Sequence, residues 1–299
     1  MSEESIRSLS VSGVPYSYRV ARQPDRSIEP VVALGGAMQG LHGWPPMEDR
    51  LGPLADVVTA DLPGMGSAGP LPPGPSLDLL CRAVEGIVDD LGDPQINLFG
   101  YSHGASVAYA FAQRFPRRIA RLVLGGPPVY ISPALQAPFH QASDALDKGD
   151  FETFATMTAK ALMCFDEDRH VVRRELTYRY VRRSLLHTSR STPHAATFVR
   201  RALSNPPEFS GGLTGVPTLV FNGEHDTLTT AARQRDFAAS IQGSRLVTIP
   251  DSDHWVILER AQDVADLAAR FFTDAPLSSA PCLVPVAREE LSAAGPAFV

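Results

Sequence analysis

The chain has 299 residues, of which 44% are hydrophobic and 20% charged, an ordinary composition for a globular protein that excludes whole-chain disorder, collagen and coiled coil. Its net charge of -6 argues against nucleic-acid binding through bulk electrostatics. No apolar stretch approaches the roughly 18 residues that a spanning helix needs, and the first five residues do not resemble a secretory signal. We therefore expect a cytoplasmic protein.

The first part of the chain alternates strand-like and helix-like segments. Residues 1–22 predict an antiparallel hairpin at one edge of a sheet, because apolar residues alternate there around Gly13 and Pro15. Apolar runs that end in Gly or Asp predict buried strands over 30–36, 56–60, 95–100 and 121–125. Helical spacing predicts helices over 76–91, with Ser76 as N-cap, and over 105–115. The alternation is typical of a mostly parallel sheet with helices on both faces.

A change of pattern divides the predicted sheet. From 129 to 215 the periodicity is helical, with no strand-like run. Strands then resume over 217–222 and 245–249, with helices over 230–241 and 259–272. We therefore predict an α/β core formed by residues 1–128 and 216–274, and a helical cap over 129–215 inserted after the sixth strand. Residues 275–299, rich in Pro, Ala and Ser, are predicted to form a C-terminal tail or arm.

The cysteines and histidines do not predict a metal site. Cys81, Cys164 and Cys282 are widely spaced, with no C-x-x-C pair, and we expect them to be reduced. The histidines lack metal-ligand spacing relative to one another and to these cysteines. We expect neither a metal nor another cofactor.

Residues 100–104, Gly-Tyr-Ser-His-Gly, fit the G-x-S-x-G pattern directly after a predicted strand and directly before a predicted helix. This context is typical of a nucleophile elbow, a sharp turn that holds a serine in a strained conformation. Small residues are needed beside it so that the strand and the helix can approach. The pattern predicts Ser102 as a nucleophile at a helix N-terminus, where amides favour developing negative charge.

Two further residues complete a candidate triad. Asp226 follows the predicted strand 217–222, and His254 follows the predicted strand 245–249, so both are placed at the sheet edge expected for Ser102. The order Ser, Asp, His is the one expected when triad members come from successive strand ends. The alternatives are a helix N-cap role for Asp226 and a surface imidazole between acids for His254, whose neighbour Asp253 is placed to perturb it.

With these motifs in place, the chain resembles the lid-bearing α/β hydrolases over roughly residues 5–273. Residues 61–67, Asp-Leu-Pro-Gly-Met-Gly-Ser, are also similar to a turn that this family carries after its fourth strand. The resemblance implies an α/β-hydrolase fold with an oxyanion hole made by the backbone amides of Ala37 and His103. The first of the two amides comes from the turn after the third strand, where residues 34–40 read Leu-Gly-Gly-Ala-Met-Gln-Gly. Gly35 stands there in place of the His that the family usually has, and the donor is the amide of Ala37 or Met38.

Several residues are candidates for the substrate pocket. Gln39 is placed to reach into the site from the turn after the predicted strand 30–36, although a solvent-facing polar residue is the alternative. The apolar candidates are Met38, Trp44, Phe139 and Met163. Apolar residues in a helical cap more often pack in a core than contact a ligand.

Residues 169–201 contain nine arginines and a single acid, Glu175. One interpretation is a solvated helix face, on which Arg179, Arg182 and Arg183 lie opposite Val172, Leu176 and Leu185. The other is a cationic surface of the cap for an acyl carrier protein or for the phosphates of a coenzyme A thioester.

The sequence thus favours a serine hydrolase that cleaves an ester, lactone or thioester of a small to medium acyl substrate through an acyl-enzyme. Only two of the 27 basic residues are lysines, which indicates GC-rich codons, and the 34–39 turn resembles hydrolases of bacterial secondary metabolism, including editing thioesterases. The alternatives left open are carbon–carbon bond hydrolysis and a non-hydrolytic relative: a ligand-binding receptor, a lyase or an acyltransferase.

Overall fold

A computed structural model describes residues 3–37, 39–73, 77–204 and 209–280. Eight strands form one sheet in the order β1-β2-β4-β3-β5-β6-β7-β8. Strands β1 and β2 form an antiparallel hairpin, β2 is antiparallel to β4, and all later pairings are parallel. The bounds are β1 Glu4–Val11, β2 Val14–Ala21, β3 Val31–Leu34, β4 Val57–Asp61, β5 Ile96–Tyr101, β6 Ile119–Gly125, β7 Thr218–Gly223 and β8 Arg245–Ile249.

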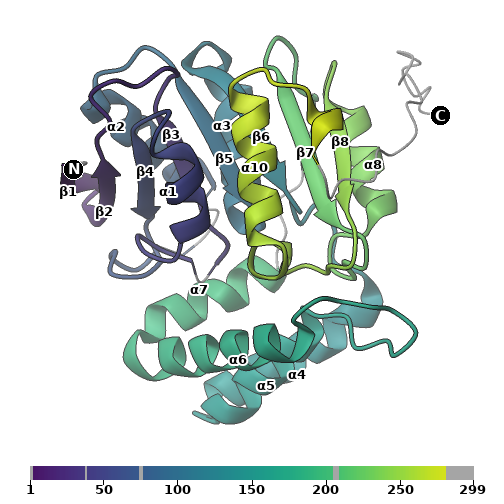
Figure 1. Cartoon of the computed structure of the whole chain (residues 1–299). Coiled ribbons are helices and arrows are strands. Elements are labelled where there is room, and N and C mark those ends of the chain that lie inside the picture. Colours follow the sequence, from purple (N-terminus) through teal and green to yellow (C-terminus); the bar gives the residue numbers. More distant parts are fainter. Residues whose placement is uncertain (1–2, 38, 74–76, 205–208, 281–299) are drawn as a thin grey trace.

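Helices cover both faces of the sheet, because alternate residues of its central strands are apolar and buried on either side (Figure 1). On one face, α1 (Pro45–Leu51) and α10 (Ala261–Phe272) pack on the side chains of Val31, Val57 and Phe99. On the other face, α2 (Leu77–Leu91), α3 (His103–Arg114) and α8 (Ala231–Ala239) pack on Val32, Val58 and Leu98. The predicted mostly parallel sheet with flanking helices is confirmed.

Among the described residues between β6 and β7 there are four helices, within the segment for which the sequence predicts only helices. They are α4 (Pro133–Asp147), α5 (Phe151–Ala161), α6 (Arg174–Ser191) and α7 (Pro193–Ser204). They lie together beyond one end of the sheet (Figure 1). Their shared apolar cluster includes Phe154, Val181, Leu185 and Val199, and Trp255 of the core packs against it. This insert, α4–α7, therefore packs both on itself and on the core.

The structure differs from the predicted elements at two short helices. Helix α1 has only seven residues and begins with two prolines, and no helix was predicted there from the sequence. The helix predicted over 259–272 corresponds to α10, and the sequence did not predict the short α9 (Val256–Glu259) before it, which is separated from α10 by the non-helical backbone of Arg260. No described helix is both long and apolar enough to cross a membrane. Ser76, Cys282 and most of the predicted C-terminal tail lie outside the described residues.

Candidate active site

Ser102 occupies a sharp turn between β5 and α3. Its backbone has φ 51° and ψ -120°, a strained conformation for a residue that is not glycine. Two glycines make the turn possible: a Cβ on Gly100 would lie 2.6 Å from the carbonyl oxygen of Gly104, and one on Gly104 would lie 2.2 Å from that of Leu34. The sequence therefore folds here into a tight strand–helix turn with the hydroxyl at the N-terminus of α3.

His254 and Asp226 lie beside this serine although they are far from it in sequence. The His254 Nε2 atom is 3.0 Å from Ser102 Oγ, and its Nδ1 atom is 2.9 Å from Asp226 Oδ2. Asp226 follows β7 and His254 follows β8, and both side chains are buried. Because the Asp226 carboxylate accepts a hydrogen bond from the Nδ1–H group, Nε2 is left as an acceptor for the serine hydroxyl. The three candidate triad residues are thus brought together in one hydrogen-bonded chain.

Asp226 is held as an anion by the residues that follow it. Its Oδ1 atom accepts hydrogen bonds from the amides of Leu228 and Thr229, and its Oδ2 atom accepts one from Thr229 Oγ1 at 2.5 Å. Burial on its own raises the pKa of Asp226, but the charge of His254 and the hydrogen bonds from His254 and Thr229 bring it below its usual value. Asp226 therefore accepts hydrogen bonds from the loop that precedes α8 as well as contacting His254, but it is not the N-cap of that helix, a position that Thr230 occupies.

The loop after β3 lies against the serine. A Cβ on Gly36 would lie 3.5 Å from Ser102 Cβ, and Ala37 follows it. The amides of Ala37 and His103, the candidate oxyanion donors, give no hydrogen bond to another group within the described residues. Two backbone donors beside a serine hydroxyl are suited to stabilise an oxyanion. Met38, the alternative donor, lies outside the described residues.

Asp61, at the end of β4, anchors this loop. Its Oδ1 atom accepts a hydrogen bond from the Leu41 amide at 3.0 Å, and its Oδ2 atom accepts from both the amide and the hydroxyl of Ser67 at 2.7 Å. A Cβ on either Gly40 or Gly66 would collide with the Asp61 carboxylate. The Asp-Leu-Pro-Gly-Met-Gly-Ser motif therefore serves as a clamp between its own turn and the loop that carries Ala37.

The chain matches the family model described as alpha/beta hydrolase fold over residues 29–261. This chain belongs to the alpha/beta hydrolase fold family.

Among curated proteins, it is similar to a 2-hydroxy-6-oxononadienedioate/2-hydroxy-6-oxononatrienedioate hydrolase 2 of Pseudomonas putida, with 30% identity over 81% of this chain and 87% of the relative. A Klebsiella pneumoniae hydrolase named for the same compounds is 28% identical over 83% of this chain and 88% of the relative. Among solved structures, the enol-lactonase of Burkholderia xenovorans LB400 has a TM-score of 0.73 at 23% identity, over 89% of this chain and all of the other (100%). That likeness shows the fold.

The side chain of His103 in this α/β hydrolase contacts the insert. Its ring packs edge-on against Phe198 of α7, with 4.7 Å between the ring centroids. Burial lowers the pKa of His103 to about 4, so the imidazole is neutral at physiological pH. The insert thus contacts the residue next to Ser102, and the contribution of His103 to an oxyanion hole is limited to its backbone amide.

The candidate pocket residues from the loop after β3 do not all face the site. Trp44 was a candidate, but this was wrong: it is 1% exposed, donates to the Gly40 carbonyl and packs on Phe99 in the core under α1 and α10. Its large apolar ring is stabilised more by that core than by a partly solvated pocket. Gln39 donates to the carbonyl oxygen of Gly43 in its own loop, and Met38 lies outside the described residues.

The candidates from the insert, or the residues next to them, contact residues that are near Asp226 or His254 in sequence. Phe139 of α4 is buried in a cluster that includes Leu228, two residues after Asp226, with Trp255 packed against it. Met163 is buried directly before Cys164, whose amide binds the residue that precedes His254. Phe139 and Met163 therefore remain candidates for an apolar wall over the site.

Two features beside the candidate triad were not identified from the sequence: the ring of Tyr101, and the pairing of Asp253 with Glu259, although Asp253 itself was noted as a neighbour of His254. The ring of Tyr101 stacks on His254 at 5.8 Å between centroids, and its buried hydroxyl has no hydrogen-bond partner among the described residues. Burial raises the pKa of Tyr101 far above its usual value, with Asp226 as the next cause. Asp253 and Glu259 form a buried carboxyl pair next to His254. Position alone predicts only that Tyr101 and Asp253 adjoin the candidate residues.

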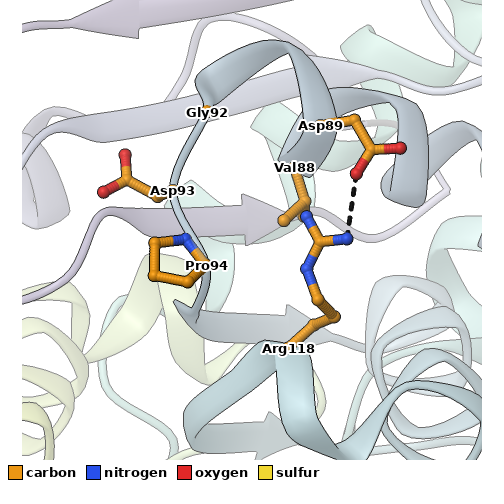
Figure 2. Close-up of a pocket in the computed structure, with 6 residues that line it drawn as sticks. All are labelled: Val88, Asp89, Gly92, Asp93, Pro94 and Arg118. Atoms are coloured by element: carbon orange, nitrogen blue, oxygen red, sulfur yellow. Dashed lines mark hydrogen bonds and ion pairs between the residues drawn. The ribbon is translucent and has the colours of Figure 1, made fainter.

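Two hollows lie elsewhere on the surface. One hollow, of about 300 Å³, lies between the end of α2 and Arg118. Figure 2 shows its lining residues, among which Arg118 pairs with Asp89. Its lining contains none of the triad residues. A smaller hollow of about 120 Å³ lies between the 70–71 turn and α7, where Phe198 contributes to the wall. In the part of the chain that the structure describes, no cluster of His, Cys, Asp and Glu side chains has the geometry of a metal site.

The arginine-rich segment is mostly paired within the insert. Arg182 of α6 donates to Thr156 and pairs with Glu152 of α5, and Arg190 pairs with the same glutamate. The helix face predicted from the sequence was therefore wrong at two positions: Arg182 faces α5, and Leu176 is 58% exposed rather than buried. Helical periodicity within α6 contains no information about Glu152 of the neighbouring helix, with which Arg182 pairs.

Proposed function

We propose that this α/β hydrolase cleaves a carboxylic ester, lactone or thioester by a serine mechanism. The observation that carries the proposal is the hydrogen-bonded chain from Ser102 through His254 to Asp226, with Ser102 in a strained turn. A serine hydroxyl is a weak nucleophile without a base, and a base works only in the correct tautomer and orientation. Both conditions are met by these three side chains.

In the proposed reaction, Ser102 Oγ attacks the substrate carbonyl carbon while His254 Nε2 takes the hydroxyl proton. The tetrahedral oxyanion is stabilised by the amides of Ala37 and His103. When it collapses, the bond to the leaving alcohol or thiol breaks, and His254 returns the proton to that group. Water, deprotonated by His254, then attacks the acyl-enzyme, which releases the acid and regenerates Ser102.

The insert supplies the surroundings of the acyl group in this proposal. Phe139, Leu228 and Trp255 form apolar packing between α4 and the loops that carry Asp226 and His254. A helical insert over the strand ends favours a small or medium-sized substrate rather than a polymer. A role in bacterial secondary metabolism remains part of the proposal, on the composition and the 34–39 turn alone.

A second candidate is hydrolysis of a carbon–carbon bond beside a keto group. The curated relatives favour it, because they are named for the hydrolysis of 2-hydroxy-6-oxo dioates, in which an oxo carbon takes the place of the ester carbonyl. The same serine and the same two amides would serve at that carbon.

The cationic face of α6 is proposed to receive a phosphate-bearing or acidic carrier of the acyl group. Arg179 and Arg183 are exposed there, beside the exposed Leu176 and Tyr180. Replacing Arg179 and Arg183 by serine is expected to raise KM for a pantetheine thioester on a carrier and leave a small ester unaffected. Equal effects on both substrates would remove this partner from the proposal. Arg182 is unsuitable for the test because it holds Glu152.

The deciding experiment compares one acyl group presented as an oxygen ester, as a pantetheine thioester and as a 2-hydroxy-6-oxo dienoate. Ser102→Ala is expected to reduce turnover of the preferred substrate at least about a hundredfold. Ser106→Ala is the matched control, because this buried serine lies one turn further along α3 and its hydroxyl has no hydrogen-bond partner within the described residues. Turnover that survives in Ser102→Ala would reject the mechanism. If the wild type turned over none of the three substrates faster than Ser102→Ala, a receptor, a lyase or another non-hydrolytic activity would be favoured instead.

A further inference from the structure

Asp253, the residue before His254, connects the insert to the loop that carries the candidate base. Its side chain is fully buried, with 0% exposed. Its Oδ2 atom accepts a hydrogen bond from the amide of Cys164, just after α5, at 2.8 Å. Its Oδ1 atom accepts one from the amide of Trp255, also at 2.8 Å. A single carboxylate therefore bonds the main chain on both sides of the interface between insert and core.

A second carboxyl group completes this arrangement. Glu259, at the end of α9, is 3% exposed, and its Oε2 atom accepts a hydrogen bond from the Asp253 amide at 2.8 Å. Burial, followed by the negative charge of Asp253, raises the pKa of Glu259 to about 9. Burial also raises the pKa of Asp253. The pair therefore holds a proton at neutral pH. The charge of Asp226 also raises the pKa of both carboxyl groups, and the pair in turn raises the pKa of Tyr101.

The surrounding backbone leaves this loop little room to move. A Cβ on Gly223, at the end of β7, would lie 2.2 Å from the Asp253 carbonyl oxygen. A second backbone bond joins insert and loop, from the amide of Val172 to the carbonyl oxygen of Asp251 at 2.9 Å. A buried carboxylate is costly to retain unless its acceptors are satisfied, and Asp253 is satisfied by bonds that fix two segments relative to each other.

We propose that Asp253 is a positioning residue, which holds the segment after α5 against the His254 loop so that the placement of the insert and of the imidazole depend on each other. Glu259 keeps a proton next to this carboxylate and so prevents two negative charges from facing each other. The inference rests on the proposed role of His254 in the serine mechanism. It assigns a function to a carboxyl pair that touches neither Ser102 nor the substrate.

The first test replaces the carboxylate by an amide. Asp253→Asn retains one acceptor but turns an NH2 group toward a main-chain N–H donor. The active fraction is counted by covalent labelling of Ser102 with a fluorophosphonate. Per labelled site, kcat is expected to fall at least about tenfold, since small displacements of a catalytic group are costly. A role in folding alone would lower the labelled fraction and leave kcat per site unchanged. Asp251→Asn is the control and should match the wild type, because the Asp251 side chain on the same loop is 44% exposed and lies beside the exposed ring of His170.

The second test uses pH and does not depend on the first variant folding. The rate of fluorophosphonate labelling of the wild type is expected to decline as pH rises through about 9, when Glu259 loses its proton beside Asp253. Glu259→Gln cannot ionise, and it should therefore lack that decline. An identical decline in both proteins would overturn the inference.

Failure of the proposed function is distinguishable from failure of this inference. If Ser102 of the wild type is not labelled, the serine mechanism fails. Hydrogen exchange at the Cys164 amide then tests the tether alone: it should be at least tenfold faster in Asp253→Asn than in Asp251→Asn. If Ser102 is labelled normally but kcat per site and Cys164 exchange match the control, the serine mechanism stands and the tether is rejected.

Discussion

The carboxylate of Asp61 accepts a hydrogen bond from the amide of Leu41, so the end of β4 holds the loop that carries Ala37. The same carboxylate also accepts two hydrogen bonds from Ser67. An oxyanion donor is effective only when it is fixed before the charge develops, because a donor that must move contributes less to the transition state. If Ala37 serves as an oxyanion donor as proposed, the Asp61 clamp influences the reaction although it lies outside the candidate triad.

We expect Asp61→Asn to lower kcat by about tenfold with little change in KM, because the loss falls on transition-state stabilisation. The amide cannot accept all three hydrogen bonds and presents a donor to Leu41 or Ser67. Steady-state kinetics on the preferred substrate provide the measurement. Asp49→Asn, an exposed acid on α1, is the control. An unchanged kcat in Asp61→Asn would show that the clamp has no influence on the oxyanion donors.

Asp226→Asn is expected to reduce kcat by roughly a thousandfold or more, because the amide favours the wrong imidazole tautomer. Thr229→Val removes only the hydroxyl that donates to Asp226 and keeps the shape of the side chain. This variant should lose much less, about tenfold at most. If both variants lost the same amount, the effect would come from disruption of the loop rather than from the tautomer of His254.

Tyr101→Phe is expected to keep the ring against His254 and to remove a buried hydroxyl that has no partner among the described residues. Leaving such a group unsatisfied costs about 1 kcal/mol or more, so the variant should unfold at the same or a higher temperature than the wild type. Activity should stay within about threefold. A large loss of activity at constant stability would instead assign the hydroxyl a role in substrate binding.

His103→Gln is expected to make the protein less sensitive to acid. The folded-state pKa of His103 is about 4, below the usual 6.5, so the unfolded chain binds the proton more readily. The neutral histidine thus contributes stability that is present above pH 6.5 and lost as pH falls toward 4. Melting temperatures measured between pH 7 and 4.5 should fall less steeply in the variant. Parallel curves would show that other groups govern acid unfolding.

Glu259→Gln is expected to change how the stability of the protein depends on alkaline pH. The folded-state pKa of Glu259, about 9, lies above its usual 4.5, so its contribution is present below pH 4.5 and lost as pH rises toward 9. The glutamine variant has no such proton to lose. Its melting temperature should therefore gain on that of the wild type from pH 5 to pH 9, and a constant difference would contradict the assignment.

The sheet, and the proximity of the three candidate triad residues, could be predicted from the sequence because both depend on local patterns. Buried parallel strands are continuous apolar runs, and the turn at Ser102 requires glycines at fixed offsets. Strand ends on one edge then bring Asp226 and His254 to Ser102 without further information.

Other features depend on contacts that no local pattern contains. The bond between Cys164 and Asp253 joins residues 89 positions apart, and Trp44 could be assigned to the core only once α10 was placed over it. The Arg182 side chain faces α5 because it pairs there with Glu152, which belongs to a different helix. Packing between elements, rather than propensity within them, decided these positions.

The insert contacts the sequence neighbours of two candidate triad residues. Phe198 of α7 packs on His103, next to Ser102, and the segment after α5 bonds Asp253, next to His254. Although α4–α7 are contiguous in the chain, they are not an exchangeable module. A chimera that received these helices from another hydrolase would need an aromatic partner for His103 and a backbone amide aimed at Asp253. Without them, a graft intended only to change the substrate would also disturb the nucleophile and its base.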